Sequence, residues 1–218
     1  MFKRLSLCLF ALSLSLGYSY AKTSYKNVYE ITIQNLTTGQ PLTPSLLAVH
    51  SSRSKIFRVG EAASDGLGAL AKDGATQTIV SELKSKKYVD FVKVGKGLIF
   101  PGNKESLRIE TSSKHVKLSI VSMLARTNDA ISVLDSASLR LRRGQVVTYF
   151  TNVYDAGVEL NTESCSDIPA PPCSSPNSGV AEESFIRPHP GIQLIGDLEA
   201  NRDAFASKVS KVTIKRIR

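Results

Sequence analysis

The chain has 218 residues, of which 42% are hydrophobic, and this length and apolar content suffice for one sizeable core. A formal net charge of +9 favours anionic partners, although a solvated basic surface that only aids solubility carries the same charge. The basic residues are spread out except at 139–143 and 211–218, tryptophan is absent and no nucleic-acid-binding motif occurs, so we expect no nucleic-acid partner.

Residues 1–21 have the features of a secretory signal peptide. Lys3 and Arg4 form the basic start, residues 5–16 form the apolar centre, and a small residue precedes the expected cleavage site. The apolar centre is too short to span a bilayer stably, so we expect no transmembrane segment after signal removal. The remaining chain, residues 22–218, is expected to be one secreted or periplasmic domain.

Alternating apolar and polar residues predict strands on both sides of a central segment with helical spacing. We expect strands at 27–37, 46–50, 88–94, 98–100, 105–110, 116–124, 131–134, 145–153 and 208–218. Residues 61–86 fit short helical turns better, and we expect them to pack on one end of the fold. Residues 105–110 and 116–124 are expected to pair with each other, and the last strand with the first. The pattern predicts an all-β fold, an antiparallel β-sandwich with a short helical insertion.

Acidic residues follow two of these strands. Asp155 and Glu159 lie on the turn that ends the strand at 145–153, where Gly157 supplies a positive φ. Asp129 lies in a loop of the same kind, after the apolar strand at 116–124. The three carboxylates therefore meet if both strands end at one edge of the sandwich. They would repel one another unless a cation lay between them, and calcium suits such oxygen ligands. On spacing alone, ordinary turn residues are the better explanation of all three.

An irregular segment rich in Pro and Ser, residues 160–190, carries the other candidate residues. Cys165 and Cys173 lie eight apart and, in an oxidising compartment, are expected to form a disulfide that stabilises the fold by roughly 2–3 kcal/mol. A zinc site is not expected, because the three histidines are scattered. Glu163 and His189 are further candidates to face the acidic site, although a turn between two prolines also explains His189.

Two runs around the acidic residues, SMLARTND at 122–129 and YDAGVE at 154–159, resemble the spondin N-terminal domain family, known from F-spondin, mindin and short bacterial secreted proteins. Further similar pieces are YEITIQN at 29–35, LTP at 42–44, FRVGEAAS at 57–64, LAKDG at 70–74, FPG at 100–102 and VTIKRI at 212–217. The resemblance implies a β-sandwich that binds calcium through Asp129, Asp155 and Glu159. Glu159 stands where the animal members have Asp, and Ala130 where they have Trp.

Motifs of common enzymes are absent: there is no nucleophile elbow, phosphate-binding loop, dinucleotide fingerprint or zinc-protease motif. We therefore expect a non-enzymatic, calcium-binding module for adhesion or recognition of an extracellular ligand. The expected partner is an anionic glycan, lipopolysaccharide or a cell-surface protein. The alternatives are an extracytoplasmic structural or stress-related protein that uses calcium only for stability, and an unrecognised hydrolase.

Overall fold

The computed structural model describes residues 26–111, 116–175 and 179–218; the predicted signal peptide, residues 1–21, lies outside them. In chain order the elements are β1 (Asn27–Asn35), β2 (Leu46–His50), α1 (Asp65–Asp73), α2 (Gln77–Ser85), β3 (Val89–Val94), β4 (Lys104–Thr111), β5 (Lys117–Met123), β6 (Ala130–Ser138), β7 (Val146–Phe150), β8 (Asn152–Asp155), β9 (Arg187–Pro188), α3 (Ala200–Asp203) and β10 (Ser210–Arg216). None of the helices in these ranges is both long and apolar enough to cross a membrane.

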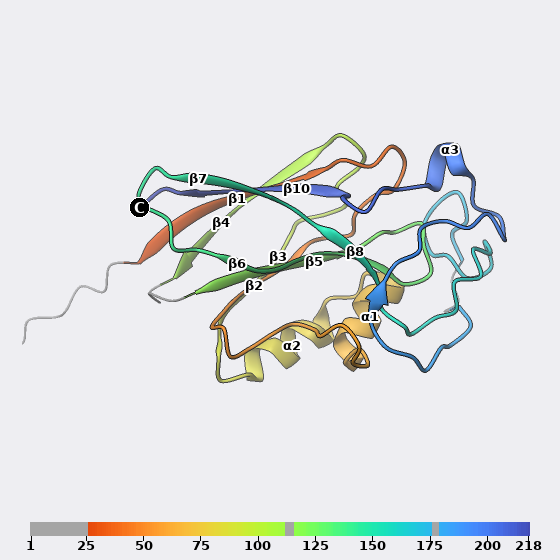
Figure 1. The fold of residues 1–218 in the computed structure, drawn as a ribbon, viewed down its shortest axis with the longest axis horizontal. Coiled ribbons are helices and arrows are strands. Elements are labelled where there is room, and N and C mark those ends of the chain that lie inside the picture. Colours follow the sequence, from red (N-terminus) through yellow and green to blue (C-terminus); the bar gives the residue numbers. More distant parts are fainter. Residues whose placement is uncertain (1–25, 112–115, 176–178) are drawn as a thin grey trace, which may run out of the picture.

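Two antiparallel sheets face each other and form a sandwich (Figure 1). One has the strand order β4-β1-β10-β7 and the other β3-β2-β5-β6-β8-β9. The predicted alternation in β1 holds, since Tyr29, Ile31 and Ile33 are buried in the core between the sheets while Glu30 is exposed. The last strand, β10, pairs with β1 as predicted. These observations confirm the all-β sandwich.

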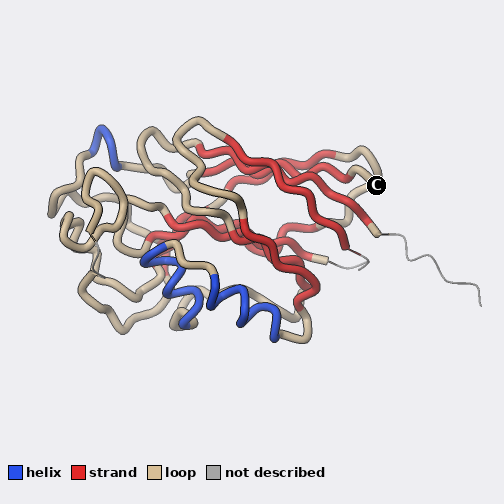
Figure 2. Tube along the Cα trace, turned by 180° about the vertical axis from the view of Figure 1, so that it is seen from behind, coloured by secondary structure: helices blue, strands red, loops and turns tan. Residues whose placement is uncertain are grey.

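The two helices of the predicted insertion cover the outer face of the six-stranded sheet (Figure 2). Their buried side chains, including Leu67 and Leu83, pack with Leu46, Ala48 and Val121 from the sheet in a second core. The expectation that the insertion packs on one end of the sandwich was therefore wrong. All five residues of β2 are buried, and a strand without a polar face needs a cover on both sides.

Two predictions about the strands were wrong, one about a pairing and one about the extent of a strand. β4 pairs with β1, whereas β5 pairs with β2 and β6, so the two strands lie in different sheets. The run at 145–153 is divided between β7 and β8, which also belong to different sheets. Between them the hydroxyl of Thr151 contacts Ser132 and Ser210, one residue from each sheet, at 2.9 Å each. Alternation with period two specifies the buried face of a strand but not its partner.

Candidate functional site

Asp129 and Asp155 lie at neighbouring strand ends, at the same end of the six-stranded sheet, as predicted. Asp129 directly precedes β6, Asp155 ends β8, and Ala130 stands opposite Asp155 in the antiparallel register. Both aspartates are 0% exposed. The long loops of the chain gather at this end, away from the C-terminus (Figure 1). The strand ends therefore carry two buried carboxylates under a cover of loops.

Only one oxygen of the Asp129 carboxylate is hydrogen-bonded. Oδ2 accepts from the backbone N–H groups of Val158, at 2.8 Å, and of Glu159, at 3.1 Å. Oδ1 is buried and has no hydrogen-bond partner among the described residues. A buried carboxylate oxygen without a donor is energetically unfavourable, which makes Oδ1 the atom of this site that most needs a further partner.

Both oxygens of the Asp155 carboxylate, in contrast, have partners. Oδ1 accepts from the Gly157 N–H at 2.8 Å, and Oδ2 accepts from the Asn161 amide at 2.6 Å. The Arg187 guanidinium also lies 2.9 Å from Oδ2 and 3.0 Å from a carboxylate oxygen of Glu182. Arg187 was missed by the sequence analysis. Its place follows from the pairing of β9 with β8, which puts Arg187 opposite Asp155, and no local pattern in the irregular segment indicates that pairing.

The turn between the two acidic residues depends on Gly157. Its φ is +70°, as the sequence predicts, and a Cβ there would lie 2.7 Å from the carbonyl oxygen of Phe185. Both the left-handed backbone and this close approach favour glycine.

We expect Gly157→Ala to destabilise the protein by about 3 kcal/mol, because the strain of the left-handed backbone adds to a collision with backbone atoms. Gly102→Ala is the matched control: Gly102 has a φ of +78° but nothing within 4 Å of its added Cβ. It should cost only about 1 kcal/mol. Urea denaturation of both variants measures the difference. Equal losses would contradict a role for the contact with Phe185.

Glu159 reaches this site through its backbone instead of its side chain. Its Oε1 accepts from the Gly179 N–H at 2.8 Å, so the carboxylate is directed toward the segment that follows the disulfide. Among residues 26–111, 116–175 and 179–218, no group of three or more His, Cys, Asp or Glu side chains is arranged to hold a metal ion. The structure thus places Asp129 and Asp155 on adjoining strand ends, with the Glu159 carboxylate bonded elsewhere.

The environment disfavours negative charge on all three residues. Burial raises the pKa of Asp129 to about 6; the neighbouring Asp155 adds to this, and the two N–H donors oppose it. Burial likewise raises the pKa of Glu159 to about 7. The pKa of Asp155 is also raised by burial, against the opposing effects of Gly157, Asn161 and Arg187. Burial removes the water that would stabilise the ionised forms. A cation would stabilise them instead, because its charge is opposite to that of the carboxylates.

The two further candidates of the irregular segment have other contacts. The Glu163 carboxylate accepts from the N–H groups of Gln193, at 2.5 Å, and of Ile195, at 3.1 Å. The His189 ring packs edge-on against Phe205, and its Nδ1 accepts from the Gly191 N–H at 2.9 Å. Burial lowers the pKa of His189 to about 4, so the ring is neutral near pH 7. These contacts fix the loop that includes residues 191–195.

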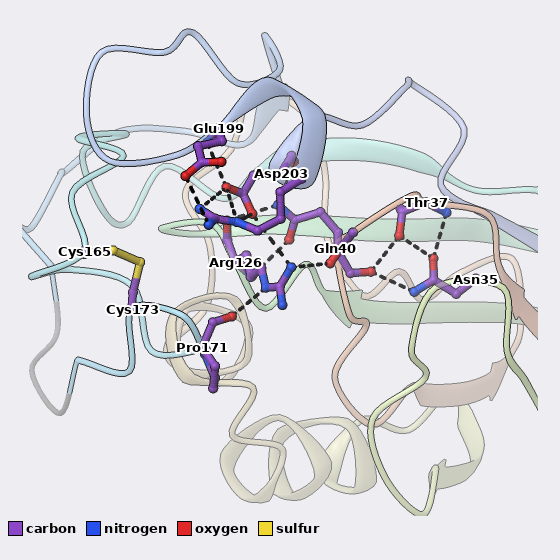
Figure 3. Close-up of polar contacts among 11 residues, drawn as sticks. Asn35, Thr37, Gln40, Arg126, Cys165, Pro171, Cys173, Glu199 and Asp203 are labelled. Atoms are coloured by element: carbon purple, nitrogen blue, oxygen red, sulfur yellow. Dashed lines mark hydrogen bonds and ion pairs between the residues drawn. A yellow bond between two sulfur atoms is a disulfide. The ribbon is translucent and has the colours of Figure 1, made fainter.

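The predicted disulfide between Cys165 and Cys173 is present, with the two Cα atoms 4.6 Å apart. Arg126, from the same loop as Asp129, holds the disulfide ring against the sandwich (Figure 3). Its Nε donates to the Pro171 carbonyl at 2.6 Å, and its Nη1 donates to the Gly39 carbonyl at 2.8 Å. The loop that positions Asp129 is therefore tied to two other loops of this end.

No curated protein matches the chain. The family model described as Spondin_N matches residues 13–175, about three-quarters of the chain, and this range includes both aspartates and the disulfide. The chain therefore belongs to the spondin N-terminal domain family.

Proposed function

We propose that this protein is a secreted or periplasmic recognition module that binds calcium between the loops of Asp129 and Asp155. Membership of the spondin N-terminal domain family supports an extracellular recognition or adhesion role. The Cys165–Cys173 disulfide suits an oxidising compartment outside the cytoplasm. Calcium would hold together the loops that meet at this end of the sandwich.

The observation that carries the calcium proposal is the buried Oδ1 atom of Asp129, which has no hydrogen-bond partner in the described part of the chain. A carboxylate oxygen is a ligand that calcium prefers, and Asp155 supplies a second carboxylate on the neighbouring strand end. These two residues fit the ion. Glu159 would have to leave the Gly179 amide to join them. When bound, the ion would add positive charge to that of Arg187, which pairs with Asp155.

We further propose that the module binds and does not catalyse. In a glycosidase, one carboxylic acid and one carboxylate flank the scissile bond. Here the Asp155 carboxylate is engaged by Asn161 and Arg187, and the Glu159 carboxylate by Gly179. Such contacts support a structural or ion-binding role for both side chains and not an acid–base pair.

A second candidate, a structural protein that uses calcium only for stability, is favoured by one observation. Asp129 and Asp155 are both 0% exposed, so an ion between them would be buried and out of reach of a large partner. The two candidates differ in one respect. Calcium would raise the melting temperature of both, but only a recognition module would also bind a partner through another surface.

Calorimetric titration of chelator-treated protein with calcium tests the ion site. We expect one site with a dissociation constant of about 0.1–1 mM, as in other extracellular modules, and a melting temperature that rises with calcium. Asp129→Asn should abolish the binding. Asp90→Asn, which removes one exposed carboxylate from β3, is the matched control and should leave it unchanged. Wild-type protein without calcium binding, or Asp129→Asn with it, would overturn the proposal.

A further inference from the structure

The structure brings together two basic runs that are far apart in the sequence. Arg140, Arg142 and Arg143 lie in the loop between β6 and β7, and Arg216 ends β10. β7 pairs with β10, and the Gly144 N–H donates to the Arg216 carbonyl at 2.8 Å. This basic end lies beside the C-terminus, opposite the acidic loops (Figure 1). The charge is thus divided between the two ends of the sandwich.

Packing within the loop turns the arginines outward. Leu139 and Leu141 are buried in the core, whereas Arg140, Arg142 and Arg143 are exposed. The three arginines and Gln145 line an open hollow of about 690 Å³. The loop is held in place, because Nη1 of Arg216 donates to the Leu141 carbonyl at 2.6 Å and the Gln145 side chain accepts from the Arg142 N–H at 2.9 Å.

Arg142 and Arg143, two of the arginines of this hollow, are not paired with a carboxylate in the part of the chain that the structure describes. In the same sheet, Glu110 pairs with Arg108 at 3.8 Å, and Glu30 stands opposite Arg108 on one side and Lys215 on the other in the register. The hollow therefore presents a concentrated positive charge to solvent.

We propose that this basic end binds a polyanionic glycan through the sulfate or phosphate groups that it carries. The planar guanidinium donates paired hydrogen bonds to such groups, and several arginines around one hollow suit a polymer with repeated charges. A nucleic acid fits less well, because aromatic side chains on which bases stack are absent from the lining of the hollow. The proposal deepens the recognition function and rests on it, but its residues are separate from the acidic loops.

Heparin serves as the probe of a sulfated glycan, with neutral dextran as the negative control and the full chain as the protein. Wild-type protein should bind heparin at 150 mM salt, and the double variant Arg142→Gln/Arg143→Gln should bind at least tenfold more weakly, with an unchanged melting temperature. Lys84→Gln/Lys86→Gln is the matched control, since it removes the same charge from exposed positions on and just after α2. The affinity of that variant for heparin should fall by less than twofold.

Several outcomes would overturn the proposal. If both double variants lost the same affinity for heparin, the net charge of the protein alone would explain the binding. Stronger binding to duplex DNA, or to vesicles containing phosphatidylglycerol, would assign the surface to another class of partner. Chelator and Asp129→Asn should leave heparin binding unchanged, so a failed calcium site does not affect this test. If chelator abolished the binding, the glycan would belong to the acidic end instead.

Discussion

Replacing Arg187 with glutamine is expected to destabilise the calcium-free protein by about 3 kcal/mol and to lower its melting temperature by about 6–12 °C. The Asp155 side chain is 0% exposed, and the Arg187 guanidinium lies 2.9 Å from its Oδ2 atom. Removal of one partner of such a pair leaves a buried charge without compensation. The effect should lie at the lower end of the range for buried pairs, because the Arg187 side chain is 30% exposed.

The Arg187 variant also links stability to the proposed calcium site. Without the guanidinium, the Asp155 carboxylate attracts a cation more strongly, so calcium should restore more stability to this variant than it adds to the wild type. Melting curves in chelator and in calcium measure both effects. A variant that stays destabilised by the same amount in calcium would indicate that the ion does not interact with Asp155.

Two control variants separate the buried pair from a general loss of charge. Arg58→Gln breaks an exposed pair with Glu61, in which both side chains are more than 60% exposed, and should change stability by less than about 0.5 kcal/mol. The double variant Asp155→Asn/Arg187→Gln should be more stable in chelator than Arg187→Gln alone, because no buried charge remains. If Arg187→Gln behaved like Arg58→Gln, Arg187 would not be the counter-charge of Asp155.

In chelator at pH 8, Asp129→Asn is expected to be more stable than the wild type by about 2 kcal/mol. Each unit by which the folded protein raises a carboxyl pKa disfavours the ionised folded state by about 1.4 kcal/mol. The pKa of Asp129 is raised from 3.8 to about 6, chiefly by burial. The asparagine oxygen can still accept from Val158 and Glu159, but its buried amide lacks an acceptor, which offsets about 1 kcal/mol of the gain.

The gain of Asp129→Asn depends on pH in a defined direction. Well below the unfolded pKa of 3.8, the Asp129 carboxyl is protonated in both the folded and the unfolded wild type, so its charge contributes nothing to the difference. As pH rises toward 6, the unfolded chain releases its proton first, and the wild type loses stability relative to the variant. The difference becomes constant only about one pH unit above the folded pKa of about 6, where the carboxyl is ionised in both states. Urea denaturation at several pH values measures this profile, and a difference that did not grow with pH would contradict the raised pKa.

Asp135→Asn is the matched control with the opposite sign. Burial acts to raise the pKa of Asp135, but hydrogen bonds from Lys55, Ser136 and Ser119 and the charge of Lys55 together outweigh it, so the pKa is lowered. A lowered pKa stabilises the folded wild type above the unfolded pKa, and this stability is lost as pH falls. Asp135→Asn should therefore be less stable than the wild type near pH 7. In calcium, the wild type should become more stable than Asp129→Asn, because this variant no longer binds the ion. Calcium should not change which of the wild type and Asp135→Asn is the more stable.

The sequence by itself determined the parts of the protein that depend on local patterns. The alternation of Tyr29, Ile31 and Ile33 specifies a strand with one buried face, and the turn at Gly157 requires a left-handed backbone. The spacing of apolar residues at 61–86 predicts short helical turns, and the structure has the helices α1 and α2 there. Both aspartates at strand ends were found in the same way, since an acidic residue after a strand is a local feature.

Only the tertiary structure decided which of these parts meet. Strand pairing puts Arg187 against Asp155 and the loop of Arg142 against the end of β10, and both contacts join segments that are far apart in the chain. The tertiary structure also directs the Glu159 carboxylate to the Gly179 N–H, whereas the backbone N–H of Glu159 donates to Asp129. The physical reason is that alternation fixes which face of a strand is buried, whereas its neighbours depend on long-range packing of the whole sandwich.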